Sequence, residues 1–162
     1  MMIKKAVFLD RDGVINKDIG DYTYRIKDFS VLPGTVEFIR KMKENGYLVI
    51  VITNQGGISK GLYDHDAVNK VHDHLERILK EQNIVLDEIY YCPHHIINEK
   101  CLCRKPGSLL IEKALARFVI DPTISFMIGD RKRDLDAGEA AGVKGILVEQ
   151  NAGLSTVLHH FL

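Results

Sequence analysis

The stretch KKAVFLDRDG, residues 4–13, decides the fold of this chain. A short apolar run ends in two aspartates, and Gly13 follows them as a turn residue. In open parallel sheets the strands are buried on both faces, and ligands bind beyond their carboxyl ends. The stretch therefore predicts the first strand of such a sheet, with a candidate site at its tip.

Four further runs share the character of this first one. They are rich in Val, Ile, Tyr and Phe and nearly continuous in apolarity, which indicates strands covered on both faces. These runs are residues 47–54, 86–92, 123–130 and 143–149. Helical patterns are found over residues 33–46, 64–83, 107–119 and 133–142, and a last helix is expected from about residue 152 to 160. The alternation predicts an α/β fold, a doubly wound, mainly parallel sheet with helices on both faces.

Length and composition limit the classes of protein to be considered. The 162 residues suit a single domain, residues 1–162. The formal net charge of zero disfavours a general nucleic-acid or acidic-membrane binder. No apolar run approaches the roughly 18–20 residues of a membrane span, and the first run has no cleavage site after it. We therefore expect a cytoplasmic protein without a nucleic-acid or membrane partner, and a monomer because no large exposed apolar surface is evident.

Aspartates follow two of the predicted strands. Asp10 and Asp12 end the first, Asp130 ends the fourth, and Asp134 comes four residues later. Like charges held this close require a cation, and hard oxygen ligands suit Mg²⁺. A metal beside carboxylates suits phosphoryl transfer. One aspartate can attack phosphorus while the other, its pKa raised by its neighbours, protonates the leaving oxygen and later activates water. A plain surface turn would explain D-x-D-G alone, but not the convergence of both groups.

Two more segments offer phosphate-binding groups. Thr53 and Asn54 end the second strand with a hydroxyl and an amide, and the Gly56–Gly57 pair lets the backbone approach a ligand closely. Lys105 is a candidate counter-charge for a phosphoryl group, with Pro106 fixing its loop. An ordinary Asn/Gly turn and a solvated lysine are the alternatives for each segment taken alone.

All three cysteines lie in residues 92–103, and an odd count without a secretion signal favours metal binding over disulfides. Cys92, His94, Cys101 and Cys103 supply a closed tetrahedral set suited to structural zinc. His95 could replace His94, and three buried cysteines beside a surface histidine are the alternative. Such a zinc staple would hold Arg104 and Lys105 above a phosphate, and the Arg104 fork could bind a second, distal phosphate.

Four motifs in this order resemble the haloacid dehalogenase-like superfamily of phosphotransferases. They are FLDRDGV at 8–14, the Thr53–Asn54 strand end, Lys105, and GDRKRD at 129–134. The resemblance implies that Asp10 is the nucleophile, that Asp12 is the general acid/base, and that Thr53 and Lys105 steady the phosphoryl group. It also implies that Asp10, Asp130 and the main-chain carbonyl of Asp12 hold Mg²⁺, while Asp134 orients Lys105.

A narrower resemblance is carried by LDRDGVIN, VITNQGGISKG, IYYCPHH and CLCRKP. These stretches are similar to phosphatases of D-glycero-D-manno-heptose 1,7-bisphosphate and to the related histidinol-phosphate phosphatases, both of which lack a large cap domain. The resemblance implies structural Zn²⁺ in the cysteine loop. It also implies a set of substrate-binding residues: Asp18, Ile19, Gly20, Asp21, Thr53, Asn54, Gln55, Gly56, Arg104 and Lys105.

The expected function is thus magnesium-dependent hydrolysis of the C7 phosphate of a heptose bisphosphate, a step toward nucleotide-activated heptose for lipopolysaccharide or surface sugars. Histidinol-phosphate hydrolysis is the alternative within enzymes. A zinc-stapled binding module is the alternative outside them, but its loop offers only Lys100, Arg104 and Lys105 as cations and leaves the aspartates unexplained. His65, His72 and His74 share no convincing ligand geometry and are expected on a solvated or half-buried helix face.

Overall fold

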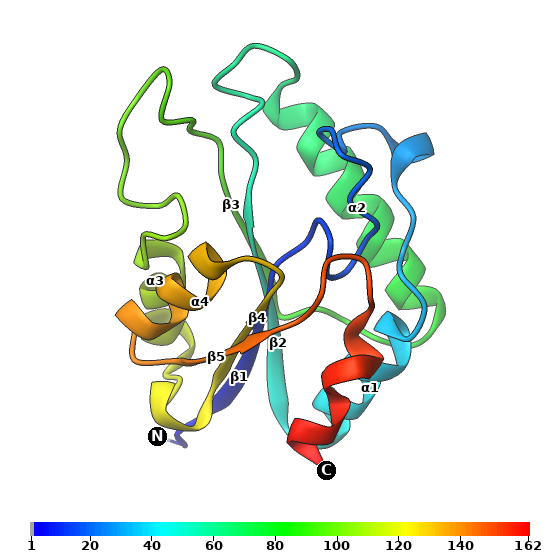
Figure 1. The fold of residues 1–162 in the computed structure, drawn as a ribbon. Coiled ribbons are helices and arrows are strands. Elements are labelled where there is room, and N and C mark those ends of the chain that lie inside the picture. Colours follow the sequence, from blue (N-terminus) through cyan, green and yellow to red (C-terminus); the bar gives the residue numbers. More distant parts are fainter. Residues whose placement is uncertain (1) are drawn as a thin grey trace.

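The computed structural model describes residues 2–162 and contains one sheet of five parallel strands (Figure 1). The strands are β1 (Lys5–Leu9), β2 (Tyr47–Asn54), β3 (Glu88–Cys92), β4 (Phe126–Gly129) and β5 (Lys144–Leu147). Their order in the sheet is β3-β2-β1-β4-β5. The chain therefore builds outward from β1 to β3 and then crosses back to place β4 on the other side of β1. In an open α/β sheet, the point where the order reverses is where ligands bind.

Helices cover both faces of the sheet, as the alternation of runs predicts. The α-helices are α1 (Thr35–Glu44), α2 (His65–Glu81), α3 (Leu109–Phe118) and α4 (Lys132–Ala140), and the 3₁₀ segments are η1 (Ile26–Asp28), η2 (Pro122–Ile124) and η3 (Leu154–Phe161). Figure 1 shows α1, α2 and the C-terminal segment on one side of the sheet and α3 with α4 on the other. The predicted doubly wound α/β class is confirmed.

Each face of the sheet has its own apolar core, because successive strand side chains point to opposite faces. On β1, Val7 and Leu9 pack with α1 and α2, whereas Ala6 and Phe8 pack with α3 and α4. All four side chains are fully buried. A strand buried on both faces accounts for the nearly continuous apolarity of the run that precedes Asp10. The rigid β1 in turn fixes where Asp10 lies.

The boundaries differ from expectation at two places. The strand expected over residues 123–130 begins only at Phe126, because Pro122 and the Asp121 side chain, which accepts a hydrogen bond from the Thr123 N–H, start a 3₁₀ turn. The last helix, expected near residues 152–160, is the 3₁₀ segment η3. Within residues 2–162, every helix is too short or too polar to cross a bilayer.

Candidate active site

The segments that carry the candidate functional residues meet at the carboxyl edge of the sheet, around the switch point beside β1. Asp10 follows β1, Asp130 follows β4, and Thr53 and Asn54 end β2. The cysteine loop leaves β3 and returns Lys105 to the same edge. Parallel pairing brings these groups together, since all five strands end on the same side.

Lys105 is the centre of the buried charges. Its Nζ lies 2.8 Å from Asp10 Oδ1 and 2.7 Å from Asp134 Oδ1, and it donates a hydrogen bond of 2.7 Å to the Ile52 carbonyl oxygen. The Lys105 and Asp134 side chains are buried almost completely. A surface lysine, the alternative weighed from the sequence, is thereby excluded. Asp134 contacts Lys105, which is the position expected of a residue that orients it.

Burial by itself shifts the pKa values of Asp10 and Lys105 in opposite directions. Burial raises the pKa of Asp10 to about 7, because the nearby Lys105 charge offsets the loss of water only in part and Asp134 adds like charge. Burial would lower the pKa of Lys105, but the negative charges of Asp10 and Asp134 outweigh it and raise that pKa. The lysine is therefore held protonated between two carboxyl groups.

Asp130 has the properties of a cation ligand. Both of its carboxylate oxygens are buried, and neither has a hydrogen-bond partner among residues 2–162. Carboxylate oxygens of Asp10, Asp130 and Asp134 lie within 4.8 Å of one another. Burial, followed by the charge of Asp134, raises the pKa of Asp130. Unpartnered buried carboxylate oxygens in an acidic cluster fit a hard divalent cation such as Mg²⁺.

Gly13 makes room for this carboxylate. Its φ of +88° is one that other residues rarely adopt, and a Cβ at this position would lie 2.4 Å from Asp130 Oδ2. The glycine after the first two aspartates is thus needed both for the turn and for the approach of the β4 end. The turn after Asp12 and the close contact with Asp130 both require glycine at this position.

Asp12 is held apart from this cluster. Its carboxylate accepts hydrogen bonds from Arg11 at 2.9 Å, Asn16 Nδ2 at 2.9 Å and Gln55 Nε2 at 3.1 Å. Burial would raise the pKa of Asp12, but the Arg11 charge and these hydrogen bonds lower it overall. The expectation that the second aspartate has its pKa raised by its neighbours is therefore wrong for Asp12, since its nearest charged neighbour is a cation.

Arg11 and His72 form a buried support that the sequence reasoning missed. The fully buried Arg11 guanidinium donates to the Thr23 carbonyl oxygen at 2.7 Å and lies 3.1 Å from His72 Nε2. His72 is 6% exposed, so the expectation of a solvated or half-buried position is wrong for this residue. Burial and the Arg11 charge lower the pKa of His72 to about 3, which keeps the ring neutral and able to accept. An arginine between two aspartates carries no local signal of such burial.

The polar residues that end β2 bond mainly to other protein groups. Asn54 pins the lysine loop, because its amide pairs with the backbone N–H and carbonyl oxygen of Lys105 at 3.0 and 3.1 Å. Gln55 is 1% exposed and donates to Thr53 Oγ1 and Asp12 Oδ2, while its backbone N–H bonds to the Cys92 carbonyl oxygen. Gln55 was expected to bind substrate. In this structure its donors are used within the protein, where they orient Asp12 and Thr53.

A pocket of about 320 Å³ opens beside Asp12. Of the expected loop residues, Asp18, Gly20 and Asp21 line it and Ile19 does not. The remaining lining residues are Asp12, Tyr22, Asn54, Arg131, Arg133 and Gln150. The lining combines two arginines with three aspartates, so it offers cations to an anionic group and acceptors to hydroxyl groups of a ligand.

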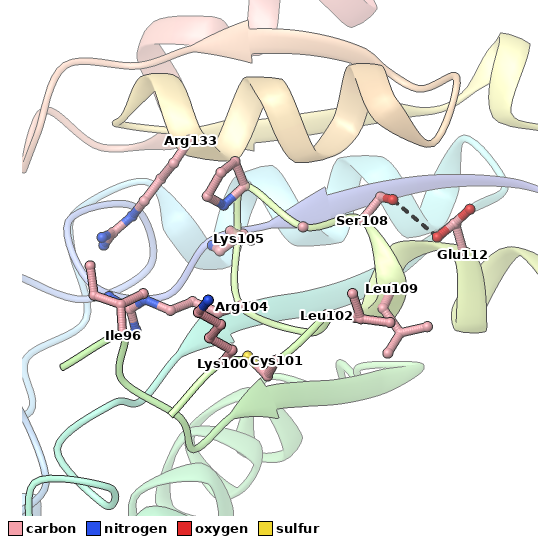
Figure 2. A pocket seen from close by; sticks show the side chains of 12 residues that line it. Ile96, Lys100, Cys101, Leu102, Arg104, Lys105, Ser108, Leu109, Glu112 and Arg133 are labelled. Carbon is pink, nitrogen blue, oxygen red and sulfur yellow. Dashed lines mark hydrogen bonds between the residues drawn. The ribbon is translucent and has the colours of Figure 1, made fainter. Parts of the chain in front are cut away.

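A larger groove of about 710 Å³ lies next to this pocket, between the cysteine loop and α3 (Figure 2). It shares Lys105 and Arg133 with the site, but its wall is formed by Ile96, Leu102 and Leu109. Because the groove has no aspartate in its lining, we assign the chemistry to the smaller pocket. Arg104 also lines the groove and donates to the His94 carbonyl oxygen at 3.2 Å, while Gly56 lies against Arg104.

The cysteine loop gathers four potential metal ligands. Cys92 Sγ lies 3.2 Å from Cys103 Sγ and 3.7 Å from Cys101 Sγ, and His94 Nδ1 lies 3.2 Å from Cys103 Sγ. The sulfurs are much too far apart for a disulfide of about 2.05 Å, and all three cysteines are free. A tetrahedral zinc ion with Zn–S bonds of about 2.3 Å holds sulfurs roughly 3.8 Å apart. The four donors therefore fit zinc, and His94 belongs to the group while His95 does not.

Comparison with known proteins agrees with this architecture. The family model described as HAD-hydrolase-like matches residues 102–160. A crystal structure of D,D-heptose 1,7-bisphosphate phosphatase from B. bronchiseptica, complexed with magnesium and phosphate, superposes with a TM-score of 0.86. That match is 33% identical and covers 98% of this chain and 88% of the other. The fold and the acidic site define a HAD-like hydrolase.

Sequence relatives narrow the class further. The D-glycero-beta-D-manno-heptose-1,7-bisphosphate 7-phosphatase of Haemophilus influenzae is 42% identical over 88% of this chain and 79% of its own length. The D-glycero-alpha-D-manno-heptose-1,7-bisphosphate 7-phosphatase of Campylobacter jejuni is 40% identical over 91% of this chain and 83% of its own length. The chain belongs to this family of phosphatases.

Proposed function

We propose that this protein is a magnesium-dependent phosphatase that removes the C7 phosphate from D-glycero-D-manno-heptose 1,7-bisphosphate. The observation that carries the proposal is the buried cluster in which Lys105 contacts Asp10 and Asp134 next to the bare carboxylate of Asp130. The names of the relatives support the substrate. The proposed setting is the cytoplasm, where the product would enter nucleotide-activated heptose synthesis.

In the proposed first step, an oxygen of Asp10 attacks phosphorus. The new Asp10 O–P bond forms as the P–O bond to C7 breaks, which yields an aspartyl-phosphate and the sugar alcohol. Asp12 gives a proton to the leaving oxygen. Arg11 holds Asp12 ionised before substrate binds, but a phosphate beside Asp12 adds negative charge and raises its pKa, favouring the protonated form at this stage.

In the second step, Asp12 takes a proton from water as the water oxygen attacks phosphorus. The Asp10 O–P bond breaks, and inorganic phosphate leaves. Lys105 and the Thr53 hydroxyl stabilise the charge on the phosphoryl oxygens, and Arg104 binds the distal phosphate. Asp10, Asp130 and the main-chain carbonyl of Asp12 would hold Mg²⁺, which neutralises phosphate charge when bound.

The zinc ligands proposed are Cys92, His94, Cys101 and Cys103, whose donor atoms lie together in the loop. No open coordination position remains in such a set, so the zinc acts mechanically. It holds the segment that carries Arg104 and Lys105.

A side-by-side turnover assay tests the proposal. The purified protein with Mg²⁺ is given the alpha and beta anomers of the heptose bisphosphate and histidinol phosphate, and the release of phosphate is measured. We expect at least tenfold higher kcat/KM on a heptose anomer, and Asp10→Asn should lose at least about 10³-fold in kcat while staying folded and zinc-loaded. Preference for histidinol phosphate would reassign the substrate. An Asp10→Asn protein that retains full turnover would overturn the mechanism.

A further inference from the structure

The loop that follows β5 contacts the loop that follows β1. Asn151 lies 133 positions after Asp18 in the chain, yet their polar groups meet. The Asn151 Oδ1 accepts a hydrogen bond of 2.7 Å from the Asp18 backbone N–H, and the Asn151 Nδ2 donates one of 3.0 Å to the Asp18 carbonyl oxygen. One amide side chain thus pairs with both backbone groups of one residue, as a neighbouring strand would.

The backbone of Asn151 is shaped for this contact. Its φ of +64° lies in the left-handed region, which asparagine tolerates better than most residues. Its backbone N–H donates to the Gly13 carbonyl oxygen at 2.9 Å. Asn151 therefore links the turn after Asp12 to the loop that begins near Lys17.

A second contact holds the Asp18 side chain. Gln150 Nε2 donates to Asp18 Oδ2 at 2.7 Å, and Arg131 Nη2 lies 3.5 Å from the same oxygen. Asp18 Oδ1 in turn accepts from the Gly20 N–H at 2.8 Å, which shapes the turn that lines the small pocket. Both the backbone and the carboxylate of Asp18 are thus fixed from the β5 loop.

The rest of residues 17–31 is anchored differently. Arg11 holds the Thr23 carbonyl oxygen, Tyr24 stacks on Tyr63 with ring centroids 4.8 Å apart, and Lys17 bonds to Ser30 at the base. These contacts hold the base and the second half of the loop. The Asp18–Asp21 end, which faces the pocket, depends on Gln150, Asn151 and Arg131.

We propose that Asn151, assisted by Gln150, is a positioning residue that locks the Asp18–Asp21 turn against the active site and thereby sets recognition of the sugar. The part concerning the sugar rests on the proposed function. A substrate that extends beyond the reacting phosphate contacts the turn, so its binding depends on the position in which Asn151 holds Asp18–Asp21. A small aryl phosphate does not reach the turn and is indifferent to it.

Asn151→Gly tests the lock, since glycine accepts the positive φ while the amide is lost. The matched control is Asn83→Gly, because Asn83 also has a positive φ, of 59°, and lies at the end of α2. Hydrogen exchange should show the Asp18 amide exchanging about tenfold faster in Asn151→Gly, which corresponds to the loss of about 1.4 kcal/mol of local protection. Asn83→Gly should match the wild type. Asn151→Asp keeps the acceptor for the Asp18 N–H and loses only the donor to the Asp18 carbonyl oxygen, so the Asp18 amide should exchange more slowly in this variant than in Asn151→Gly.

Kinetics tests the consequence. For the heptose bisphosphate we expect KM to rise about tenfold in Asn151→Gly, with kcat changed by less than about twofold. For p-nitrophenyl phosphate both constants should change by less than about twofold. Unchanged exchange of the Asp18 amide, or an equal loss on both substrates, would overturn the proposal. If the wild type hydrolyses the aryl phosphate but not the heptose bisphosphate, the proposed function fails, and the exchange data still decide whether Asn151 locks the turn.

Discussion

The Lys105 side chain makes several of the contacts that hold the candidate site together. It bridges Asp10, which follows β1, and Asp134, which lies in the first turn of α4, and it also donates to the backbone of β2 at Ile52. A buried charge needs such partners to compensate for the loss of water. The buried carboxyl groups depend on the lysine for the same reason. The same ammonium group thus has a structural task before any phosphate arrives.

We predict that Lys105→Met lowers the free energy of unfolding of the metal-free protein by about 3–5 kcal/mol, because two buried carboxyl groups lose the cation that contacts both of them. Turnover should fall as well. Urea unfolding in the presence of a chelator measures the first effect. The control is Lys132→Met, which removes an exposed lysine paired with Asp136 and should change stability by less than about 0.5 kcal/mol. Equal stability of both variants would contradict the prediction.

His72 predicts a pH dependence of stability. Its pKa is lowered to about 3 in the fold by burial and by Arg11, against an ordinary value of 6.5, with Asp12 opposing and Tyr91 packed against the ring. A depressed pKa stabilises the fold above pH 6.5, and this stability is lost as pH falls toward 3. Between pH 7 and pH 5 the free energy of unfolding should therefore fall by about 2 kcal/mol on account of this residue.

His72→Gln isolates this contribution. The variant should lose stability at pH 7 but show a flatter dependence of unfolding free energy on pH between 7 and 5. The exposed His159 provides the control, since His159→Gln should leave the wild-type slope unchanged. An unaltered slope in His72→Gln would mean that the ring titrates normally in the fold.

Among the elements, the cysteine loop should depend on a bound metal ion for its structure. We predict that the wild type binds one equivalent of zinc and that His94→Ala lowers zinc affinity at least tenfold, because a ligand of the tetrahedral set is lost. His95→Ala should keep the zinc, since His95 is outside the set. Elemental analysis and chelator competition measure the zinc, and far-UV circular dichroism checks that the sheet survives. Loss of zinc in His95→Ala alone would exchange the roles of the two histidines.

Most of these elements could be predicted from the sequence. The apolar runs are strong signals because the central strands β1, β2 and β4 are buried on both faces, and the convergence of Asp10, Asp130 and Lys105 follows once the strands are parallel. The burial of Arg11 and His72 could not be predicted in the same way, since the two residues contact each other but lie 61 positions apart in the chain. The contact between Asn151 and Asp18 joins two loops and has no periodic pattern at all.

For the molecule as a whole we predict a monomer in solution. Most of the large exposed apolar side chains are scattered, and a cluster formed by Ile96, Leu102 and Leu109 borders the groove beside the cysteine loop. Light scattering should give a mass close to 18.3 kDa at micromolar concentration. A doubled mass would contradict this, and Leu102→Glu would then show whether the cluster is the contact, because a charge there should restore the single mass.

The strand order has a consequence for synthesis on the ribosome. β1 emerges first, but one of its two hydrogen-bonding edges is taken by β4, which lies more than a hundred residues later. Until residues 126–129 leave the exit tunnel, the middle of the nascent sheet has an open, apolar edge of the kind that recruits foreign strands. Translation speed over the second half of the message, and the chaperones that meet it, therefore decide how long this chain is exposed to aggregation.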